Sequence, residues 1–260
     1  MYVAGVDSGA LTTKAVILGD GKVLSHEIVL TGMGGKAHEV VEMALSKADL
    51  STDDLAFVVA TGYGRINVPF AAKQVTEITC HGRGAHFLIP TTRMIIDVGG
   101  QDSKVIRLNE QGNVVDFAMN DKCAAGSGRF LEVMANALEI DLEEMGKLSL
   151  RSKKTVEISS TCTVFAESEV ISHIASGIPK EDIIAGIHRA IASRVAGLFF
   201  SKVRRKVEQD SVVMTGGVAK NIGMIKSLEE EIGIRIIVPP KPQIVGALGA
   251  ALIAQEECFM

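Results

Sequence analysis

Residues 3–18, VAGVDSGALTTKAVIL, decide the fold, because the same order of parts returns at residues 94–108, MIIDVGGQDSKVIRL. In each segment an apolar run leads into an acidic turn with glycine and then into a second apolar run. Each copy continues into a further strand pattern, GDGKVLSHEIV in the first and NEQGNVVDFAM in the second. The identities that recur at an offset of 90 residues are Asp7 with Asp97, Gly9 with Gly99, Lys14 with Lys104 and Leu18 with Leu108.

Two strand–turn–strand units can resemble each other by chance. Identities at one fixed offset, in residue types that carry function, favour a duplication instead. The sequence therefore predicts a duplicated domain, built on two β-hairpins, with a cleft between its halves.

Composition limits the class of protein. The chain has 260 residues, of which 47% are hydrophobic and 22% charged, which excludes a disordered or fibrous protein. A formal net charge of −4 argues against nucleic-acid binding as the main role. No apolar run approaches the roughly 18 residues of a membrane span, and the N-terminus lacks the basic region of a signal peptide. We expect a soluble cytoplasmic α/β protein that binds no nucleic acid and no membrane.

Helix and strand patterns alternate along the rest of the chain. A buried strand is predicted over residues 56–61, and further strands over SVVMT (211–215) and IRIIVP (234–239). Helical spacing of apolar residues predicts helices over residues 37–48, 128–139, 163–176, 182–207, 218–231 and 246–256.

Three glycine-rich turns, at 7–9, 97–102 and 215–218, each follow an apolar strand pattern. Glycine lets backbone N–H groups reach phosphate oxygens without a Cβ in the way. Carboxylates beside a polyphosphate repel it unless they hold Mg²⁺, so Asp7 and Asp97 indicate a magnesium nucleotide. The chain contains no GxxxxGK[ST], which excludes a P-loop, and no GxGxxG after a strand.

This ordered set of turns resembles the actin, Hsp70 and sugar-kinase superfamily, whose duplicated ribonuclease-H-like halves hold ATP in the cleft. Residues 7–14 match the first phosphate loop, 97–102 the second and 214–218 the adenosine motif. The resemblance implies one half over residues 1–92 and a second over 93–260. The C-terminal helix, 246–256, would pack back on the first half.

The resemblance also implies roles for single residues. Asp7 and Asp97 would hold Mg²⁺ through water, and Gln101 would orient the attacking water. Alanine and leucine replace the usual hydroxyl residues after Gly9, so only backbone donors remain there. The implied nucleotide contacts are Ser8, Gly9, Ala10, Leu11, Thr12, Thr13, Lys14, Gly99, Gly100, Gln101, Gly216, Gly217, Val218 and Gln243.

Four cysteines occur without a CxxC pair, so a zinc ribbon or thioredoxin-type site is excluded. Cys80 is interpreted as a small buried hydrophobe, and Cys258 lies near the chain end. Cys123 and Cys162 each precede a helical pattern, where a thiolate or a ligated anionic cluster is stabilised. Two thiolates per chain cannot complete a four-thiolate site, whereas a two-fold dimer can. Two unrelated buried cysteines remain the alternative at this point.

A closer resemblance covers nearly the whole chain. Its motifs are TGYGR, DVGGQDSKVI, MNDKCAAGSGRFLEVMA, ISSTCTVFAESEVISHI, AGIHRAIASRV and MTGGVAKN. These segments resemble the activators of 2-hydroxyacyl-CoA dehydratases and the ATPase subunits of benzoyl-CoA reductase. The resemblance implies a homodimer that shares one [4Fe–4S] cluster, with Cys123 and Cys162 as ligands. Gln243, Gly246 and Gly249 match the family's PxxQxxGALGAA stretch.

The leading hypothesis is an ATP-dependent one-electron donor. Reduced ferredoxin or flavodoxin would load the cluster, and ATP hydrolysis would drive the electron to a cluster-containing dehydratase. The alternatives are an activator of another reductase, such as benzoyl-CoA reductase, and a small-molecule kinase with Asp102 as base. A nucleotide-controlled scaffold similar to actin is a third class.

Overall fold

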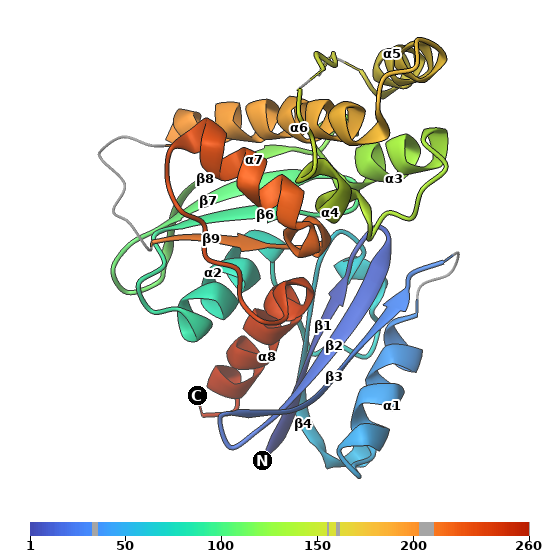
Figure 1. The fold of residues 1–260 in the computed structure, drawn as a ribbon. Coiled ribbons are helices and arrows are strands. Elements are labelled where there is room, and N and C mark those ends of the chain that lie inside the picture. The colour runs from blue at the N-terminus through green and yellow to red at the C-terminus, as the bar shows by residue number, and fades with distance from the viewer. Residues whose placement is uncertain (33–35, 155, 160–161, 203–210, 260) are drawn as a thin grey trace. The chain divides into compact units, whose positions relative to one another are not determined.

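The computed structural model describes residues 1–32, 36–154, 156–159, 162–202 and 211–259. The chain forms two compact units. Unit 1 comprises Met1–Arg93, Leu108–Val115 and Pro239–Met260, and unit 2 comprises Met94–Arg107 and Asp116–Val238. The C-terminal helix therefore belongs to unit 1, far along the chain from the strands that it covers (Figure 1).

Unit 1 is built on a five-stranded sheet with the order β3-β2-β1-β4-β5. β1 pairs antiparallel with β2 and parallel with β4, and Asp7 lies opposite Lys14. The tight turn between β2 and β3 uses two left-handed residues, Asp20 and Gly21. The strands are β1 (Tyr2–Ser8), β2 (Thr12–Gly19), β3 (Lys22–Leu30), β4 (Leu55–Thr61) and β5 (Lys73–Gln74).

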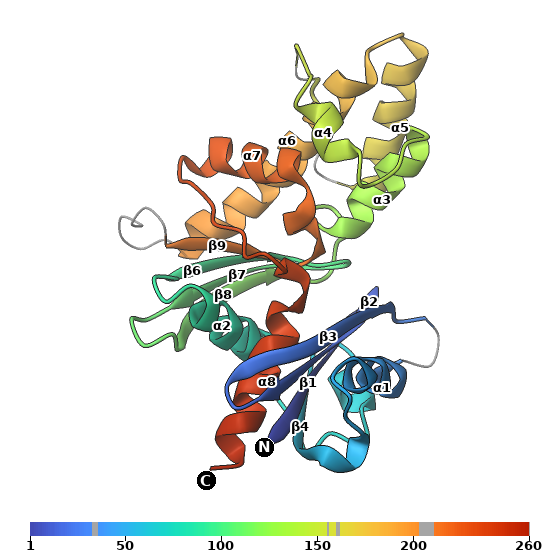
Figure 2. The same cartoon turned by 60° about the horizontal axis from the view of Figure 1, so that its bottom comes forward.

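Both faces of this sheet are covered by helices. α1 (Ala37–Lys47) packs on one face, and α8 (Val245–Glu257) packs on β1 and β4 and against α2 (Glu77–Leu88). α8 and α2 lie side by side in both orientations (Figures 1 and 2). Successive residues of β1 point to opposite faces, so Val3 joins the core under α8 and Ala4 the core under α1.

Unit 2 repeats this strand arrangement. Its sheet has the order β8-β7-β6-β9, with β6 antiparallel to β7 and parallel to β9. Asp97 lies opposite Lys104, which is the register of Asp7 and Lys14 in unit 1. The repeated strand–turn–strand pattern of the sequence is thus present in both sheets. The strands are β6 (Met94–Val98), β7 (Ser103–Leu108), β8 (Val114–Asn120) and β9 (Val212–Thr215).

The core of unit 2 is formed mainly by its helices. α6 packs against α4, α5 and α7, and α3 packs against α5. These helices are α3 (Gly128–Ala137), α4 (Met145–Ser149), α5 (Thr163–Ala175), α6 (Lys180–Lys202) and α7 (Ile222–Ile232). By length and composition α6 is long and apolar enough to cross a membrane, although the sequence analysis expected no such segment. Most of that stretch is buried in the core, however, and core helices meet the same criterion.

Two predicted elements differ from the structure. The helix predicted over 218–231 is divided at Asn221 into the short 3-10 helix η3 (Gly217–Lys220) and α7, because Asn221 caps α7 with its side chain. In place of the strand predicted over 234–239, the described part of the chain has a single isolated bridge, between Ile237 and Val213. The predicted helix 182–207 extends past α6 into residues 203–210, which lie outside the described residues.

Candidate functional site

The first predicted phosphate loop follows β1 directly. Asp7 is 6% exposed, and its Oδ2 lies 3.3 Å from Nζ of Lys14. The N–H of Gly9 donates to the carbonyl oxygen of Thr12 at 3.1 Å and closes the turn. A Cβ on Gly9 would lie 2.8 Å from that oxygen, so the turn requires glycine.

The second segment that shapes this loop follows β4. The N–H of Gly64 donates to the carbonyl oxygen of Ser8 at 2.8 Å. Gly62 has φ +89°, and a Cβ there would lie 2.4 Å from Oδ1 of Asp7. Nη1 of Arg65 donates to the carbonyl oxygen of Gly62 at 3.0 Å and thereby fixes the turn. The TGYGR motif is thus packed against the acidic residue of the loop.

Neighbouring side chains hold the far end of the same loop. Oγ1 of Thr31 donates to the carbonyl oxygen of Gly9 at 2.9 Å and shares a hydrogen bond with Oγ1 of Thr13 at 3.0 Å. Of the predicted contact residues, Ser8 and Thr13 are buried and Ala10 is exposed. Gly9, Leu11, Thr12 and Lys14 are half-buried.

The sequence analysis did not identify His81, a buried histidine near Asp7. His81, on α2, is 6% exposed, and a Cβ on Gly246 would lie 2.9 Å from its Nε2. The same Cβ would lie 3.2 Å from Oδ2 of Asp7. His81, Gly246 and Asp7 thus converge, although no local pattern in the sequence links them.

The second predicted phosphate loop has the same design in unit 2. The N–H of Gly99 donates to the carbonyl oxygen of Asp102 at 2.9 Å, as Gly9 does to Thr12. Asp97 is 3% exposed, and its Oδ1 accepts a hydrogen bond from the hydroxyl of Thr215 at 2.8 Å. Nζ of Lys104 lies 3.6 Å from Oδ2 of Asp97 and 2.6 Å from Oδ2 of Asp102. Sequence reasoning aligned Lys104 with Lys14 but assigned it no role.

The exposed part of this second loop contacts the start of α3. Gln101 is exposed at the turn. The N–H groups of Gly128 and Arg129 donate to the carbonyl oxygens of Gly99 and Gly100, both at 2.8 Å. The first turn of α3 is thus hydrogen-bonded to the loop.

The predicted adenosine motif lies at the end of β9. Gly216 has φ +86°, and a Cβ there would lie 2.3 Å from the carbonyl oxygen of Val98. Gly217 is exposed at the start of η3, and Val218 is buried within it. Gln243 is half-buried in the 3-10 helix η4 (Pro242–Ile244) of unit 1. The structure therefore brings Gly216 together with the second phosphate loop, inside unit 2.

The two candidate cluster cysteines both lie in unit 2. Cys123 is half-buried in the loop before α3, where Nδ2 of Asn120 donates to its carbonyl oxygen at 3.0 Å and to that of Ala125 at 2.9 Å. Cys162 is half-buried, has an extended backbone and directly precedes α5. Because α3 and α5 pack together, the two cysteine segments begin neighbouring helices.

The other two cysteines have different surroundings. Cys80 is fully buried in α2, and burial raises the pKa of its thiol to about 12, so it remains protonated. Cys258 is half-buried at the end of α8. Among the described residues of one chain, no three His, Cys, Asp or Glu side chains come together as a metal site.

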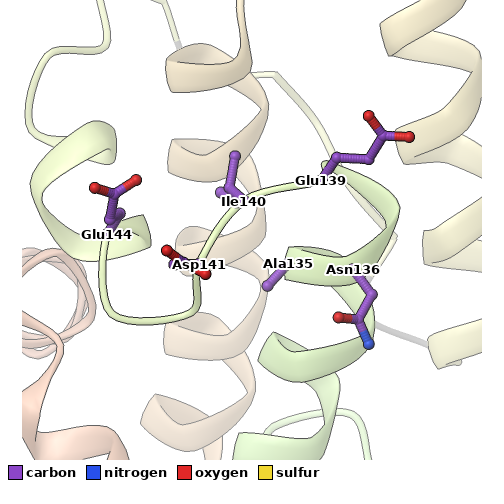
Figure 3. A pocket seen from close by; sticks show the side chains of 6 residues that line it. All are labelled: Ala135, Asn136, Glu139, Ile140, Asp141 and Glu144. Carbon is purple, nitrogen blue, oxygen red and sulfur yellow. The ribbon is translucent and has the colours of Figure 1, made fainter.

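An acidic pocket of about 400 Å³ lies elsewhere in unit 2 (Figure 3). It is lined by Ala135, Asn136, Glu139, Ile140, Asp141 and Glu144, none of which is a predicted site residue. Its three carboxylates would repel phosphate, so this pocket is not a candidate nucleotide site.

Comparison with known proteins identifies the family of this chain. Residues 4–254 match the BadF/BadG/BcrA/BcrD ATPase family over almost the entire chain. The chain belongs to this ATPase family. The prediction of an ATPase, made from the acidic glycine turns and the resemblance, is confirmed at this level.

Relatives within the family are similar over their whole length. The (R)-2-hydroxyglutaryl-CoA dehydratase activating ATPase of Acidaminococcus fermentans is 49% identical over 261 residues, covering 99% of this chain and 98% of that protein. The structure of the activator of 2-hydroxyisocaproyl-CoA dehydratase from Clostridium difficile, with bound ADPNP, superimposes with a TM-score of 0.94 at 48% identity. That match covers 100% of this chain and 96% of the activator.

Two further proteins are less similar, one a relative in sequence and the other similar in fold alone. A subunit of the benzoyl-CoA reductase of Thauera aromatica is 36% identical over 83% of this chain and 77% of its own length. A ROK hexokinase from Thermus thermophilus shares the fold alone, with a TM-score of 0.55 at 16% identity over 99% of this chain and all of that one. The predicted fold class and the resemblance to dehydratase activators are both confirmed.

Proposed function

We propose that this family member is an ATP-dependent activator that delivers single electrons to a partner 2-hydroxyacyl-CoA dehydratase. One observation carries the proposal. Cys123 and Cys162 precede two packed helices of one unit, in a chain about half identical to dehydratase activators. Neither cysteine is fully buried, and each precedes one of these two packed helices, which favours a shared ligand over unrelated core thiols.

The two phosphate loops would bind Mg²⁺–ATP. Each is a tight turn closed by the N–H of its glycine, Gly9 or Gly99, and lies beside a buried carboxylate. Carboxylate oxygens and water are the ligands that Mg²⁺ prefers, so Asp7 and Asp97 fit this ion. Lys14 and Lys104 hold both carboxylates in place before the ion binds.

Gln101 is the candidate for orienting the attacking water. It is exposed at the apex of the second loop, directly after Gly99 and Gly100. A carboxamide can accept a hydrogen bond from water and donate another to a phosphate oxygen. Asp102 is a poor candidate for a kinase base, because Lys104 pairs with its carboxylate at 2.6 Å. This contact favours ATP hydrolysis over transfer of the phosphoryl group to a small molecule.

Cys123 and Cys162 would hold a [4Fe–4S] cluster together with the same cysteines of a second copy. Both thiols are partly accessible, unlike that of Cys80, and unit 2 contains no other cysteine. A cluster bound there would supply a one-electron carrier of low potential. The helix that begins after Cys162 exposes Val164 and Phe165, each 65% accessible, which supports a homodimer that covers them.

A short hydrogen-bonded path runs from the second predicted phosphate loop toward Cys123. The carbonyl oxygens of Gly99 and Gly100 accept from the first turn of α3, and Cys123 lies a few residues before that turn. A change in the second loop on ATP hydrolysis would therefore move the start of α3. ATP can bias the protein only if the loop makes different contacts with ATP and with ADP, and this path would carry such a difference to the start of α3.

The partner, rather than this chain, would bind the acyl-CoA. The named relatives serve dehydratases for 2-hydroxyglutaryl-CoA and 2-hydroxyisocaproyl-CoA, although they share about half of this sequence. A reduced ferredoxin or flavodoxin would be the electron donor, and the cytoplasm the compartment. The reductase alternative has the weaker support, because the benzoyl-CoA reductase relative is only 36% identical.

An anaerobic activation assay tests the proposal. The chain is mixed with a purified 2-hydroxyacyl-CoA dehydratase, a reduced low-potential carrier and Mg²⁺–ATP, and dehydration is followed. We expect turnover with ATP and none with ADP. Asp7→Asn and Asp97→Asn should each lower ATP hydrolysis at least about 100-fold, since each removes a charge that holds the metal. The exposed carboxylate variant Asp53→Asn is the matched control and should keep full activity.

Activation that proceeds equally with ADP, or that needs no nucleotide, would contradict the proposal. Phosphorylation of an added alcohol or sugar by this chain, with no activation, would support the kinase alternative instead.

A further inference from the structure

His188 is a buried histidine that the function proposed above does not use. It lies in the middle of α6 and is 0% exposed. Its Nε2 lies 3.1 Å from Nδ2 of Asn221, and its Nδ1 has no hydrogen-bond partner among the described residues. Buried polar atoms are nearly always paired, so a buried histidine with one nitrogen lacking a partner among the described residues calls for a physical explanation.

The hydrogen bonds of Asn221 determine the state of the imidazole. Oδ1 of Asn221 accepts from the N–H of Met224 at 3.0 Å and so caps α7. Its Nδ2 then faces His188, and an amide nitrogen can only donate. Nε2 of His188 must therefore accept, which means that the ring is neutral and carries its proton on Nδ1.

The surroundings of the ring leave no room for a ligand. A Cβ on Gly223 would lie 2.8 Å from Nδ1 of His188 and 2.1 Å from Oγ of Ser149. A Cβ on Gly146 would lie 2.7 Å from Oδ1 of Asn221. Glycine backbone thus closes around the pair from α4 and α7. His188 acts on Asn221 and not on a bound molecule.

Asn221 follows the 3-10 helix η3, in which the predicted adenosine motif, 214–218, ends. Its N–H donates to the carbonyl oxygen of Val218 at 2.9 Å. At the other end of the motif, the hydroxyl of Thr215 donates to Asp97. The predicted motif is therefore held near its start by Asp97 and at its last residue, Val218, by Asn221, which contacts His188.

We propose that His188 is a positioning residue for the adenosine end of the nucleotide. Through Asn221 it holds η3 in the conformation that binds ATP. The inference rests on the proposed function, because η3 contacts adenosine only if the chain binds ATP there. His188 affects neither phosphate loop directly, so its removal should weaken ATP binding and leave the rate of the chemical step intact.

Three variants separate positioning from simple packing. In His188→Gln, the side-chain oxygen can accept from Asn221 in place of Nε2. In His188→Leu, the volume is similar but the acceptor is absent, which leaves a buried amide without a partner. Asn221→Ser keeps a good helix cap but loses the contact with His188, and it serves if the leucine variant does not fold.

The measurements are the KM for ATP, kcat, and inhibition of ATP hydrolysis by inorganic tripolyphosphate, which has no adenosine. We expect His188→Leu and Asn221→Ser to raise the KM for ATP about tenfold, with kcat within twofold of wild type. The inhibition constant of tripolyphosphate should stay within twofold in every variant. His188→Gln should keep the wild-type KM. Nitrogen-15 NMR of the wild-type ring should show the proton on Nδ1.

Each other outcome has one meaning. An unchanged KM in both His188→Leu and Asn221→Ser would overturn the inference. So would an inhibition constant for tripolyphosphate that rises in parallel with the KM, because the defect would then be general. A proton on Nε2 would also overturn it. A wild-type chain that neither binds nor hydrolyses ATP would instead contradict the proposed function, and this inference with it.

Discussion

The side chain of Lys104 is more buried than that of Lys14, the matching lysine in unit 1. Its side chain is 4% exposed and lies between Asp97 and Asp102, whereas that of Lys14 is 14% exposed and pairs with Asp7 alone among the described residues. The two lysines occupy the same register opposite their aspartates. Their different burial predicts different consequences when the charge is removed.

Lys104→Met should lower the free energy of unfolding by about 3–5 kcal/mol, because it leaves two carboxylates near each other without their cation. Lys14→Met serves as the matched control and should cost less, since it leaves only one. Urea unfolding without nucleotide measures both. A loss for Lys14→Met equal to or greater than that for Lys104→Met would contradict this account.

His188 gives the folded protein a dependence on pH. Burial lowers the pKa of His188 from 6.5 to about 4. The unfolded chain therefore takes up this proton near pH 6.5 and the native chain only near pH 4, so stability falls as the pH falls through that range. At about 1.4 kcal/mol per pH unit, the loss between pH 6.5 and 5 is about 2 kcal/mol.

The test compares urea unfolding of wild type and His188→Gln at pH 6.5 and at pH 5. The variant lacks the titrating ring, so its loss of stability should be about 2 kcal/mol smaller. Equal losses in the two proteins would contradict this account, because they would show that His188 takes up its proton at the same pH in the native and unfolded chains.

The sequence marks the residues of the predicted phosphate loops more clearly than the residues that pack around them. Asp7 and Asp97 stand out because a repeat marks them at a constant offset. His81 and Asn221 do not stand out in the sequence. His81 lies beside Gly246, and Asn221 contacts His188, and each pair joins segments far apart in the chain. Such contacts depend on tertiary packing, which no local pattern records.

At the scale of elements, glycine is required for packing in one helix and not in another. Gly249 of α8 lies against α2, and a Cβ there would be 1.8 Å from the carbonyl oxygen of Cys80. Gly197 of α6 is exposed and has nothing within 4 Å of the same position. The first glycine permits two backbones to approach, whereas the second only weakens its helix.

Gly249→Ala should therefore lower the free energy of unfolding by about 3 kcal/mol, because neither backbone can yield without separating α8 from α2. Gly197→Ala is the matched control and should raise it by about 0.5–1 kcal/mol through helix propensity. Thermal unfolding of both variants measures the effect. A stabilised Gly249→Ala protein would contradict the packing of α8 on α2.

The same packing explains which elements the sequence predicted. Helices with clear apolar spacing agree within two residues: 37–48 with α1, 128–139 with α3 and 163–176 with α5. Helix α2 was missed because Gly82 and Gly84 lower its helix propensity. A Cβ on Gly84 would lie 2.2 Å from the carbonyl oxygen of Val245, so contact with the start of α8 requires the glycine.

At the scale of the whole molecule, the chain is one strand pattern used twice. Both sheets pair the first strand antiparallel with the second and parallel with a later strand, β4 in unit 1 and β9 in unit 2. The offset of 90 residues predicted this duplication from the sequence. The two units differ in the segments outside these shared strands. The segments that begin at Cys123 and Cys162 belong to unit 2 alone.

The central claim is that these two segments, from two copies of the chain, hold one iron–sulfur cluster. The most direct measurement is an anaerobic count of iron and acid-labile sulfide, with an EPR spectrum after dithionite reduction. It is made on wild type, Cys123→Ser, Cys162→Ser and, as the matched control, Cys258→Ser. We predict about four irons and four sulfides per two chains in wild type and Cys258→Ser, and loss of both iron and the EPR signal in the other two variants. A wild-type protein without iron after anoxic reconstitution, or iron retained when Cys123 and Cys162 are replaced, would contradict the account.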